Sequence, residues 1–289
     1  MKHKLEYDLA NWTEVSTQPV NTLQLFITNR CNKRCKGCFV SHKLGKGDMT
    51  FEEYIGYVKN PEYSNEIQKL ILLGGEPTIH PDLTRMLDFN REMKLRTTIY
   101  TNGFDLKKLD EIDMSNVSLR IGVYGNNSSE KPLSSIERTK LQVDIVYMLR
   151  KNNVGELLET ANTAGNEFNC RGFYISSIRD IAVSQSFWKD TEETLPLDDY
   201  AKVIQNFVNK YKGNIPKLHI ARRGILYTDM PEKPTECCRF GNIFLDGDKI
   251  ICPLDISKRI TTDKLVFNKR KCNKNSSCIL TKIVLEKKN

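Results

Sequence analysis

Short apolar runs alternate with longer amphipathic stretches along the chain, and this alternation predicts strands separated by helices. The expected strands are 22–28, 69–73, 96–101, 117–124, 156–162 and 217–221. The expected helices begin at Thr50, span about 82–93, run from Ser134 to about Lys151, and span 197–211. Strands that alternate with helices form parallel βαβ units. The pattern therefore predicts an α/β fold, and six such units fit a partial (β/α)6 TIM-like barrel.

Two segments have the sequence of a capping box, in which a Ser or Thr begins a helix and a Glu three residues later closes its first turn. One segment pairs Thr50 with Glu53, and the other pairs Ser134 with Glu137. Both pairs are therefore expected helix starts.

The pattern changes after about residue 225. Residues 242–252 are expected to form a hairpin that turns at Asp246-Gly247. Five of the nine cysteines lie in this last segment. Its apolar runs are short, so its fold needs an additional stabilising link, such as a metal bound by the cysteines. We therefore expect two domains, a barrel at 1–225 and a small auxiliary module at 226–289.

Composition narrows the class of protein. The chain has 289 residues and a formal charge of +8, but its basic residues are scattered, which is typical of a solvated surface, and no nucleic-acid-binding motif is present. No apolar run is long enough to span a bilayer, and the N-terminus has no apolar signal region. We expect a cytoplasmic protein with neither nucleic acid nor membrane as a partner. Its cysteines are then metal ligands or catalytic thiols rather than disulfides.

Three cysteines, Cys31, Cys35 and Cys38, follow the first expected strand with the spacing C-x3-C-x2-C. Three thiolates can hold a [4Fe–4S] cluster and leave one iron open, whereas a structural zinc site takes four closed ligands. The spacing resembles the signature of radical S-adenosylmethionine (SAM) enzymes, which cleave SAM to a 5'-deoxyadenosyl radical. The resemblance implies a SAM-binding cluster, SAM itself, and an electron donor such as flavodoxin or ferredoxin.

The segment Gly74-Gly75-Glu76-Pro77 resembles the GGEP motif of the same family, which binds the amino group of SAM's methionine. Two glycines allow close backbone approach, and a carboxylate can accept a charge-assisted hydrogen bond from an ammonium group. An ordinary strand-to-helix turn is the alternative. Gly74, Gly75 and Glu76 are therefore expected to bind the cofactor.

Thr101 and Asn102 end another expected strand, and they are candidates to bond the ribose or the methionine carboxylate of SAM. Asn-Gly is also a common turn pair, so a plain turn is the alternative. Phe39 resembles the aromatic residue that the family places near adenine; otherwise it packs in the core. All three motifs fall at the carboxyl ends of strands, where parallel barrels place their chemistry. Further SAM or substrate contacts are left open among Arg120, Asn162 and Arg171.

The cysteines near the C-terminus resemble a shortened auxiliary-cluster domain of the SPASM or twitch type. Four thiolates would close a second [4Fe–4S] cluster, and a four-cysteine zinc site is the alternative. The expected ligands are Cys237, Cys252, Cys272 and Cys278. Too few cysteines remain for the two auxiliary clusters of a full SPASM domain.

Two cysteines are spare, Cys170 and one of the adjacent pair Cys237-Cys238. Cys237 fits the family spacing better, although Cys238 stays an alternative ligand. A free Cys238 thiol in the active site can return a hydrogen atom to a substrate radical, as a radical epimerase requires; an incidental buried thiol is the alternative. Cys170 is expected to be structural.

These features resemble the epimerases that convert L- to D-residues in ribosomally made peptides, so we expect an epimerase with a precursor peptide as its partner. A second hypothesis is a radical SAM maturase that cross-links a peptide through thioether or C–C bonds. A third is an epimerase or dehydrogenase acting on a sugar or aminoglycoside. A zinc-stapled binding module without catalysis is the non-enzyme alternative. Residues 1–21 precede the first expected strand, which disfavours a peptide-binding domain there.

Overall fold

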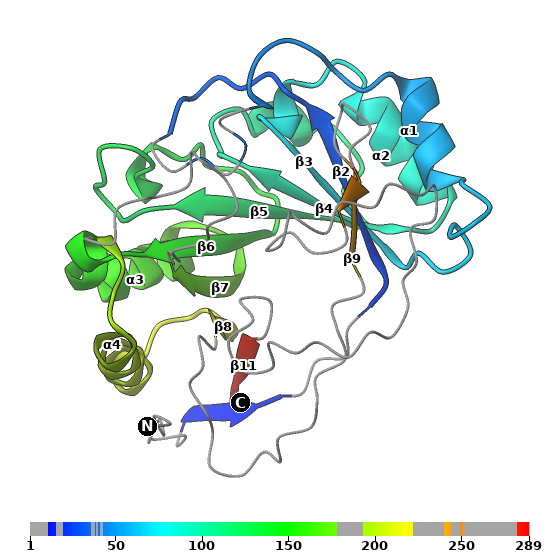
Figure 1. The fold of residues 1–289 in the computed structure, drawn as a ribbon. Coiled ribbons are helices and arrows are strands. Elements are labelled where there is room, and N and C mark those ends of the chain that lie inside the picture. Colours follow the sequence, from blue (N-terminus) through cyan, green and yellow to red (C-terminus); the bar gives the residue numbers. More distant parts are fainter. Residues whose placement is uncertain are drawn as a thin grey trace.

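One mixed sheet runs through the molecule and is built mainly of parallel strands (Figure 1). The computed structural model describes residues 11–15, 20–35, 38, 40, 43–177, 193–221, 240–243, 249–250 and 282–288. The strands are β1 (Trp12–Glu14), β2 (Thr22–Thr28), β3 (Lys69–Gly74), β4 (Arg96–Thr101), β5 (Val117–Val123), β6 (Val143–Leu149), β7 (Cys170–Ser177), β8 (Lys217–Ala221), β9 (Phe240–Ile243), β10 (Lys249–Ile250) and β11 (Lys282–Lys287). The helices are α1 (Phe51–Val58), α2 (Leu83–Glu92), α3 (Leu157–Glu167) and α4 (Leu197–Lys210), with 3₁₀ turns η3 (Pro77–Ile79), η4 (Lys107–Leu109), η5 (Leu133–Ser135) and η6 (Lys151–Glu156).

Strands β2 to β8 lie side by side in chain order and are all parallel. Strand β9 pairs with β2 in parallel, and β11 pairs with β8 in antiparallel orientation, so the last part of the chain extends both edges of the sheet. The parallel strands and the helices between them form the partial TIM-like barrel expected from the sequence.

Alternate residues of each strand point to opposite faces of the sheet, as the pleat requires. In β5, Leu119, Ile121 and Val123 are fully buried in the main hydrophobic cluster, together with residues of the four α-helices. Arg120 and Gly122 therefore lie on the opposite face, which we call the inner face. The helices cover the outer face (Figure 1).

Two elements differ from the sequence prediction. Residues 134–151 were expected to form a helix, but η5 ends at Ser135 and 143–149 form strand β6. The reason is that burial along β6 has a period of two residues: every second residue from Val143 to Leu149 is buried in the core. The β-branched residues of this segment also favour a strand. The capping-box prediction at Ser134 is therefore wrong, whereas that at Thr50 is confirmed by reciprocal bonds with Glu53.

The expected strand 156–162 is instead the start of α3. Leu157, Ala161 and Ala164 are buried along one face at helical spacing, which is why this segment packs as a helix. Candidate Asn162 therefore lies on a helix, and β7, which the sequence analysis missed, follows. The hairpin expected at 242–252 agrees with the antiparallel pairing of β9 with β10, while its turn lies outside the described residues. The two-domain division stays a prediction.

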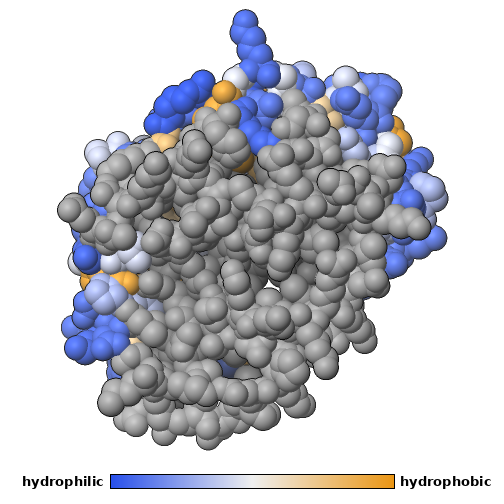
Figure 2. All heavy atoms as spheres, viewed as in Figure 1, coloured by the Kyte–Doolittle hydropathy of each residue, from blue (hydrophilic) through white to orange (hydrophobic). Residues whose placement is uncertain are grey.

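The described surface visible in Figure 2 is mostly hydrophilic. Among the described residues, the exposed large hydrophobic residue is Met93, with 41% of its surface accessible to solvent. Among the helices of the described part of the chain, none has both the length and the apolar character needed to cross a bilayer.

Candidate active site at the carboxyl ends of β2, β3 and β4

The cysteine loop leaves the carboxyl end of β2, and all three of its thiols are half-buried. The backbone N–H of Cys38 donates to the Cys35 carbonyl at 3.3 Å, and the N–H of Lys33 lies 3.4 Å from the Cys31 sulfur. Burial is the main reason that the pKa of each thiol is raised, and the charge of a neighbouring cysteine raises it further. The three thiols therefore form one electrostatically coupled group.

An ion pair braces the start of this loop. Arg30 donates to Asp48 at 2.8 and 3.0 Å, and its Nη2 donates to the Ile79 carbonyl at 3.0 Å. The Thr28 hydroxyl donates to the same Asp48 carboxylate at 2.6 Å. Burial alone would raise the pKa of Asp48, but the hydrogen bonds from Thr28 and Arg30 outweigh it and lower the pKa. The loop is thus tied to the segments before α1 and after β3.

Gly74 and Gly75 press the end of β3 against the cysteine loop. A Cβ atom on Gly74, whose φ is +143°, would lie 2.2 Å from the Thr28 carbonyl oxygen; one on Gly75 would lie 2.1 Å from the Arg30 carbonyl oxygen. Backbone hydrogen bonds of 2.7 and 2.8 Å join Gly75 to Thr28 and Glu76 to Arg30. Only glycine permits this approach. In the structure the two glycines make this close contact with the cysteine loop, and their expected contact with the cofactor stays a prediction.

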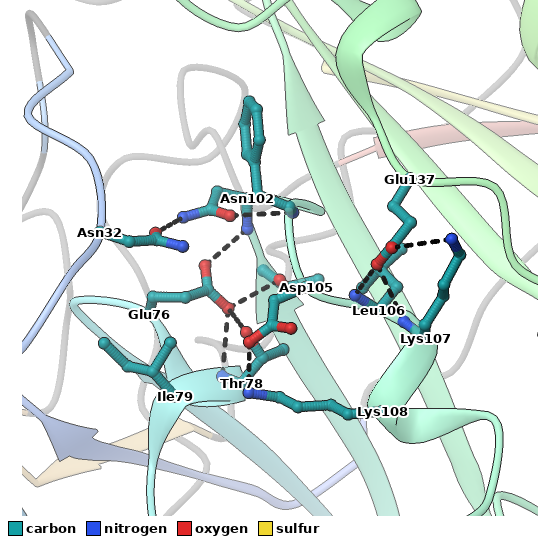
Figure 3. A network of polar contacts seen from close by, with 12 residues as sticks. Asn32, Glu76, Thr78, Ile79, Asn102, Asp105, Leu106, Lys107, Lys108 and Glu137 are labelled. Carbon is teal, nitrogen blue, oxygen red and sulfur yellow. Dashed lines mark hydrogen bonds and ion pairs between the residues drawn. The ribbon is translucent and has the colours of Figure 1, made fainter.

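Glu76 is the centre of a buried network (Figure 3). Its side chain is 1% exposed, and its Oε1 accepts hydrogen bonds from the backbone and hydroxyl of Thr78 at 3.1 and 2.8 Å and from the hydroxyl of Thr101 at 2.7 Å. Its Oε2 accepts from the backbone N–H of Asn102 at 2.7 Å. These bonds fix the ends of β3 and β4 relative to each other.

Asn102 carries the network to the cysteine loop. Its Nδ2 donates to the Oδ1 of Asn32 at 2.7 Å, and its own Oδ1 accepts from the backbone N–H of Phe104 at 3.2 Å (Figure 3). Asn32 directly follows Cys31 in the sequence. The structure therefore brings Gly74, Gly75, Glu76, Thr101 and Asn102 together beside the first cysteine, as parallel strands ending at one rim allow.

Lys131 is a further charge at this end of the sheet. A Cβ atom on Gly122, on the inner face of β5, would lie 3.8 Å from its Nζ, and its positive charge acts on all three thiols of the loop, lowering their pKa values against the effect of burial. Sequence reasoning missed Lys131, as it missed Arg30, Asn32, Asp48 and Thr78. Arg30, Asn32 and Asp48 carry no local signal, because their partners are distant in the sequence. Thr78 bonds Glu76 two residues before it, and this contact follows from the local turn after β3.

Several predicted site residues lie outside the described residues, namely Phe39, Cys237, Cys238, Cys252, Cys272 and Cys278. Cys170 is described: it packs against the core, its Sγ lies 3.4 Å from the Gly172 carbonyl oxygen, and burial raises its pKa to about 12. This agrees with a structural role for Cys170.

The donor set of the loop fits an iron–sulfur cluster, since three coupled thiols from one short segment are the ligands that such a cluster takes. Within the described part of the chain, no three His, Cys, Asp or Glu side chains lie close enough together to bind a single metal ion. An iron–sulfur cluster does not require that arrangement, because each thiolate binds a different iron of the cluster.

A family model described as the radical SAM superfamily matches residues 25–170, just over half of the chain. The chain belongs to the radical SAM superfamily. The match includes the cysteine loop, the Gly74–Glu76 segment and the end of β4. Membership in the radical SAM superfamily implies SAM and a [4Fe–4S] cluster as cofactors.

The sequence likeness to one relative extends over about half of each chain. A probable GTP 3',8-cyclase of Thermococcus kodakarensis is 28% identical over 170 residues, which are 51% of this chain and 55% of that protein. This chain thus spans about half the length of that relative.

Two solved structures share the fold. Streptococcus suis SuiB bound to the precursor peptide SuiA has a TM-score of 0.64 at 15% identity, over 86% of this chain and 63% of SuiB. Native anSMEcpe with bound AdoMet and the Cp18Cys peptide has a TM-score of 0.56 at 16% identity, over 86% of this chain and 76% of that one. At these identities the likeness concerns the fold.

Proposed function

We propose that this radical SAM enzyme inverts residues of a ribosomally made peptide from the L to the D configuration. The SAM-binding part of this proposal rests on the continuous hydrogen-bond network from Asn32 through Asn102 to Glu76. It links the cysteine loop to two further strand ends through buried hydrogen bonds. A site held so rigidly is suited to orient a bound cofactor, because positioning of reacting groups depends on well-packed supporting bonds.

In this proposal Cys31, Cys35 and Cys38 hold the cluster, and Glu76, Thr101 and Asn102 line the SAM site, with Phe39 against the adenine. When bound, the reduced cluster supplies the electron that cleaves SAM to the 5'-deoxyadenosyl radical. The chain's own contribution is to fix the loop through the Arg30–Asp48 pair and the Gly74-Gly75 contact described above. Lys131 adds a positive charge beside the thiolates, which favours their ionised form.

The two similar structures support a peptide as substrate, since both contain a bound peptide. The named activity of the Thermococcus relative favours a second candidate, radical chemistry on a small molecule. Of the two, the peptide hypothesis rests on structures that cover 86% of this chain, whereas the relative covers 51%.

Epimerisation would need a hydrogen-atom donor, and we propose the Cys238 thiol. The substrate Cα–H bond breaks as its hydrogen atom passes to the 5'-deoxyadenosyl radical, forming 5'-deoxyadenosine. Cys238 then returns a hydrogen atom to the opposite face of the carbon, and the resulting thiyl radical takes up one electron from the reductant and one proton from solvent. We propose Cys237, Cys252, Cys272 and Cys278 as ligands of an auxiliary cluster.

The first test measures 5'-deoxyadenosine after anaerobic reconstitution with iron, sulfide, SAM and dithionite. The wild-type chain is expected to form it, and the Cys31/Cys35/Cys38→Ala variant is expected to form none. Cys170→Ala removes a thiol that lies outside the loop and serves as the matched control. Equal production by the triple variant and the wild type would exclude the proposed SAM site.

The second test addresses the auxiliary cluster and the donor. In the Cys31/Cys35/Cys38→Ala background we expect one residual four-iron cluster, lost with Cys237→Ala and kept with Cys238→Ala. With the wild-type enzyme and a peptide substrate in D2O, deuterium should enter the inverted carbon, because a thiol exchanges with solvent. Product without deuterium, or loss of the cluster with Cys238→Ala alone, would contradict epimerisation through this thiol.

A further inference from the structure

A row of polar residues crosses the inner face of the sheet below the cysteine loop. In the strand register Tyr100 of β4 lies opposite Arg120 of β5, Arg120 opposite Asp144 of β6, and Asp144 opposite Gly172 of β7. A Cβ atom on Gly172 would lie 3.2 Å from the Oδ1 of Asp144, so the glycine leaves the space that this carboxylate occupies. None of these residues belongs to the Glu76 network.

Arg120 is the centre of the row and is only 8% exposed. Its Nη1 donates to the hydroxyl of Tyr100 at 2.6 Å, and its Nη2 donates to the hydroxyl of Tyr174 at 2.7 Å and lies 3.3 Å from the Oδ2 of Asp144. The guanidinium lies 4.0 Å from the centroid of the Tyr174 ring. Its buried Nε has no hydrogen-bond partner. The position of this cation is therefore fixed, and its donor capacity is not fully used.

Asp144 forms ion pairs with two arginines, Arg120 and Arg171. Arg171 binds it through two bonds, from Nε at 3.1 Å and from Nη2 at 2.9 Å, while Arg120 approaches from the other side. Asp144 is 1% exposed, but the side chain of Arg171 is 41% exposed and so reaches toward solvent. One carboxylate balances one of the two guanidinium charges.

Lys69, at the start of β3, adds a third cation on the inner face, because Leu70 and Leu72 of the same strand are buried in the outer hydrophobic cluster. Within the described residues its half-buried ammonium makes no hydrogen bond or ion pair. Burial, followed by the charges of Arg120, Arg96 and Arg171, lowers the pKa of Lys69 to about 8, although Asp144 opposes the shift. At neutral pH the ammonium is thus still mostly protonated, and the group formed by Lys69, Arg120, Arg171 and Asp144 has an excess of positive charge.

Like charges in a partly buried site repel strongly unless an anion balances them. We propose that the cation group of Lys69, Arg120 and Arg171 binds a carboxylate of the substrate on the inner face of the sheet. The planar fork of an arginine suits a carboxylate, as the Arg171–Asp144 pair already demonstrates. This inference rests on the proposed peptide substrate, whose anionic groups are Asp and Glu side chains and the C-terminus.

The test measures how fast Lys69 is acetylated by acetic anhydride in the full chain, quantified by mass spectrometry relative to the exposed Lys94 on the outer surface. The probe is N-acetylglutamic acid amide, and its uncharged control is N-acetylglutamine amide. A bound carboxylate raises the pKa of Lys69 and covers it, so the carboxylate probe is expected to slow its labelling about threefold to tenfold. The glutamine analogue is expected to have no effect.

Variants separate binding from general salt effects. Arg171→Gln should abolish the protection, whereas Arg85→Gln, which removes an exposed arginine of α2, should retain it. The inference is overturned if the carboxylate probe leaves Lys69 labelling unchanged, if the glutamine analogue protects equally, or if Arg171→Gln keeps full protection. Protection by inorganic phosphate but not by the carboxylate probe also overturns it.

The same preparation is assayed for 5'-deoxyadenosine, which keeps the two proposals distinguishable. Lys69 protection without SAM cleavage would retain the carboxylate site and reject the proposed radical function. SAM cleavage without protection of Lys69 would retain the proposed radical function and reject the carboxylate site. Neither readout depends on knowing the natural substrate.

Discussion

Glu76 accepts four hydrogen bonds from three residues while almost completely buried, and its neutral isostere cannot do the same. An amide in its place would turn one acceptor into a donor that faces a backbone N–H or a hydroxyl. The functional role proposed for this side chain therefore coincides with a structural one. Any test of cofactor binding at Glu76 must separate these two effects.

For Glu76→Gln we expect the free energy of unfolding to fall by about 2–3 kcal/mol, because charge-assisted bonds are lost and a buried donor is left unpaired. Urea unfolding monitored by circular dichroism measures this loss. SAM affinity, measured by calorimetry on the reconstituted protein, is expected to fall as well.

Glu137→Gln is the matched control, since Glu137 accepts from the backbone N–H groups of Leu106 and Lys107 at 2.6 and 2.9 Å but is part of a separate group in Figure 3. Its partly exposed carboxylate should make the change less destabilising. SAM affinity is expected to be unchanged. Equal weakening of SAM binding by both substitutions would contradict a specific role for Glu76.

His80 makes stability depend on pH. Its Nδ1 accepts from the backbone N–H of Asp82 at 3.0 Å and its Nε2 donates to the Met49 carbonyl at 3.0 Å, an arrangement that only the neutral ring allows. Burial lowers the pKa of His80 in the folded state, although Asp48 acts in the opposite direction. The unfolded chain therefore binds the proton first as the pH falls.

Stability is expected to be complete above a pH of about 6.5 and to fall by up to about 1.4 kcal/mol per pH unit below it, until the folded-state pKa is reached. Urea unfolding at about pH 7.5 and about pH 5.5 measures the change, and His80→Gln should reduce it. A variant that loses as much stability on acidification as the wild type would show that another group is responsible.

At the level of elements, the turn after β3 is held by two glycines whose missing Cβ atoms admit the cysteine loop. The contact is between backbones, so neither chain segment can move aside through a change of rotamer. The position of Arg30 and Cys31, where the cysteine loop begins, is thus set by the shape of a neighbouring turn.

Gly74→Ala and Gly75→Ala are each expected to destabilise the protein by about 3 kcal/mol or more, because the new methyl group overlaps a carbonyl oxygen. Iron content after reconstitution should fall in parallel. Gly56→Ala is the control: its Cβ meets nothing within 4 Å in the middle of α1, and alanine should stabilise the helix by up to about 1 kcal/mol. If all three variants unfold alike, the close contact has no energetic importance.

Across the whole molecule, one sheet connects the beginning, middle and end of the chain. Strand β11 lies between β1 and β8, and its Ile283 and Leu285 are fully buried in the same hydrophobic cluster as the parallel strands. The last strand thus completes the core of the barrel. Folding of the described strands is expected to be a single cooperative event.

Ile283→Ala should lower the free energy of unfolding by about 2–5 kcal/mol, as large-to-small core substitutions do. Lys288→Ala, at an exposed position just after β11, should change it by less than about 0.5 kcal/mol. Circular dichroism and tryptophan fluorescence should follow one coincident transition in both variants. Two separated transitions would show that the C-terminal strand belongs to an independent unit.

The sequence alone determined the class of fold and placed three closely spaced thiols directly after the first parallel strand, because both depend on local patterns. Thr22–Thr28 and Arg96–Thr101 are strands with the expected bounds, and the Thr50–Glu53 capping box forms as predicted. Alternation, capping and cysteine spacing involve residues a few positions apart, so one stretch of chain contains the whole signal.

The tertiary structure decided what depends on distant partners. Residues 143–149 became a strand because they pair with β5 and β7 and bury alternate side chains, which overrode the helix expected there. Asn32 meets Asn102, and Arg120 meets Asp144 and Tyr174, only because parallel strands end at one rim and align in a particular register. Register and strand order arise from packing of the whole sheet, and no local pattern encodes them.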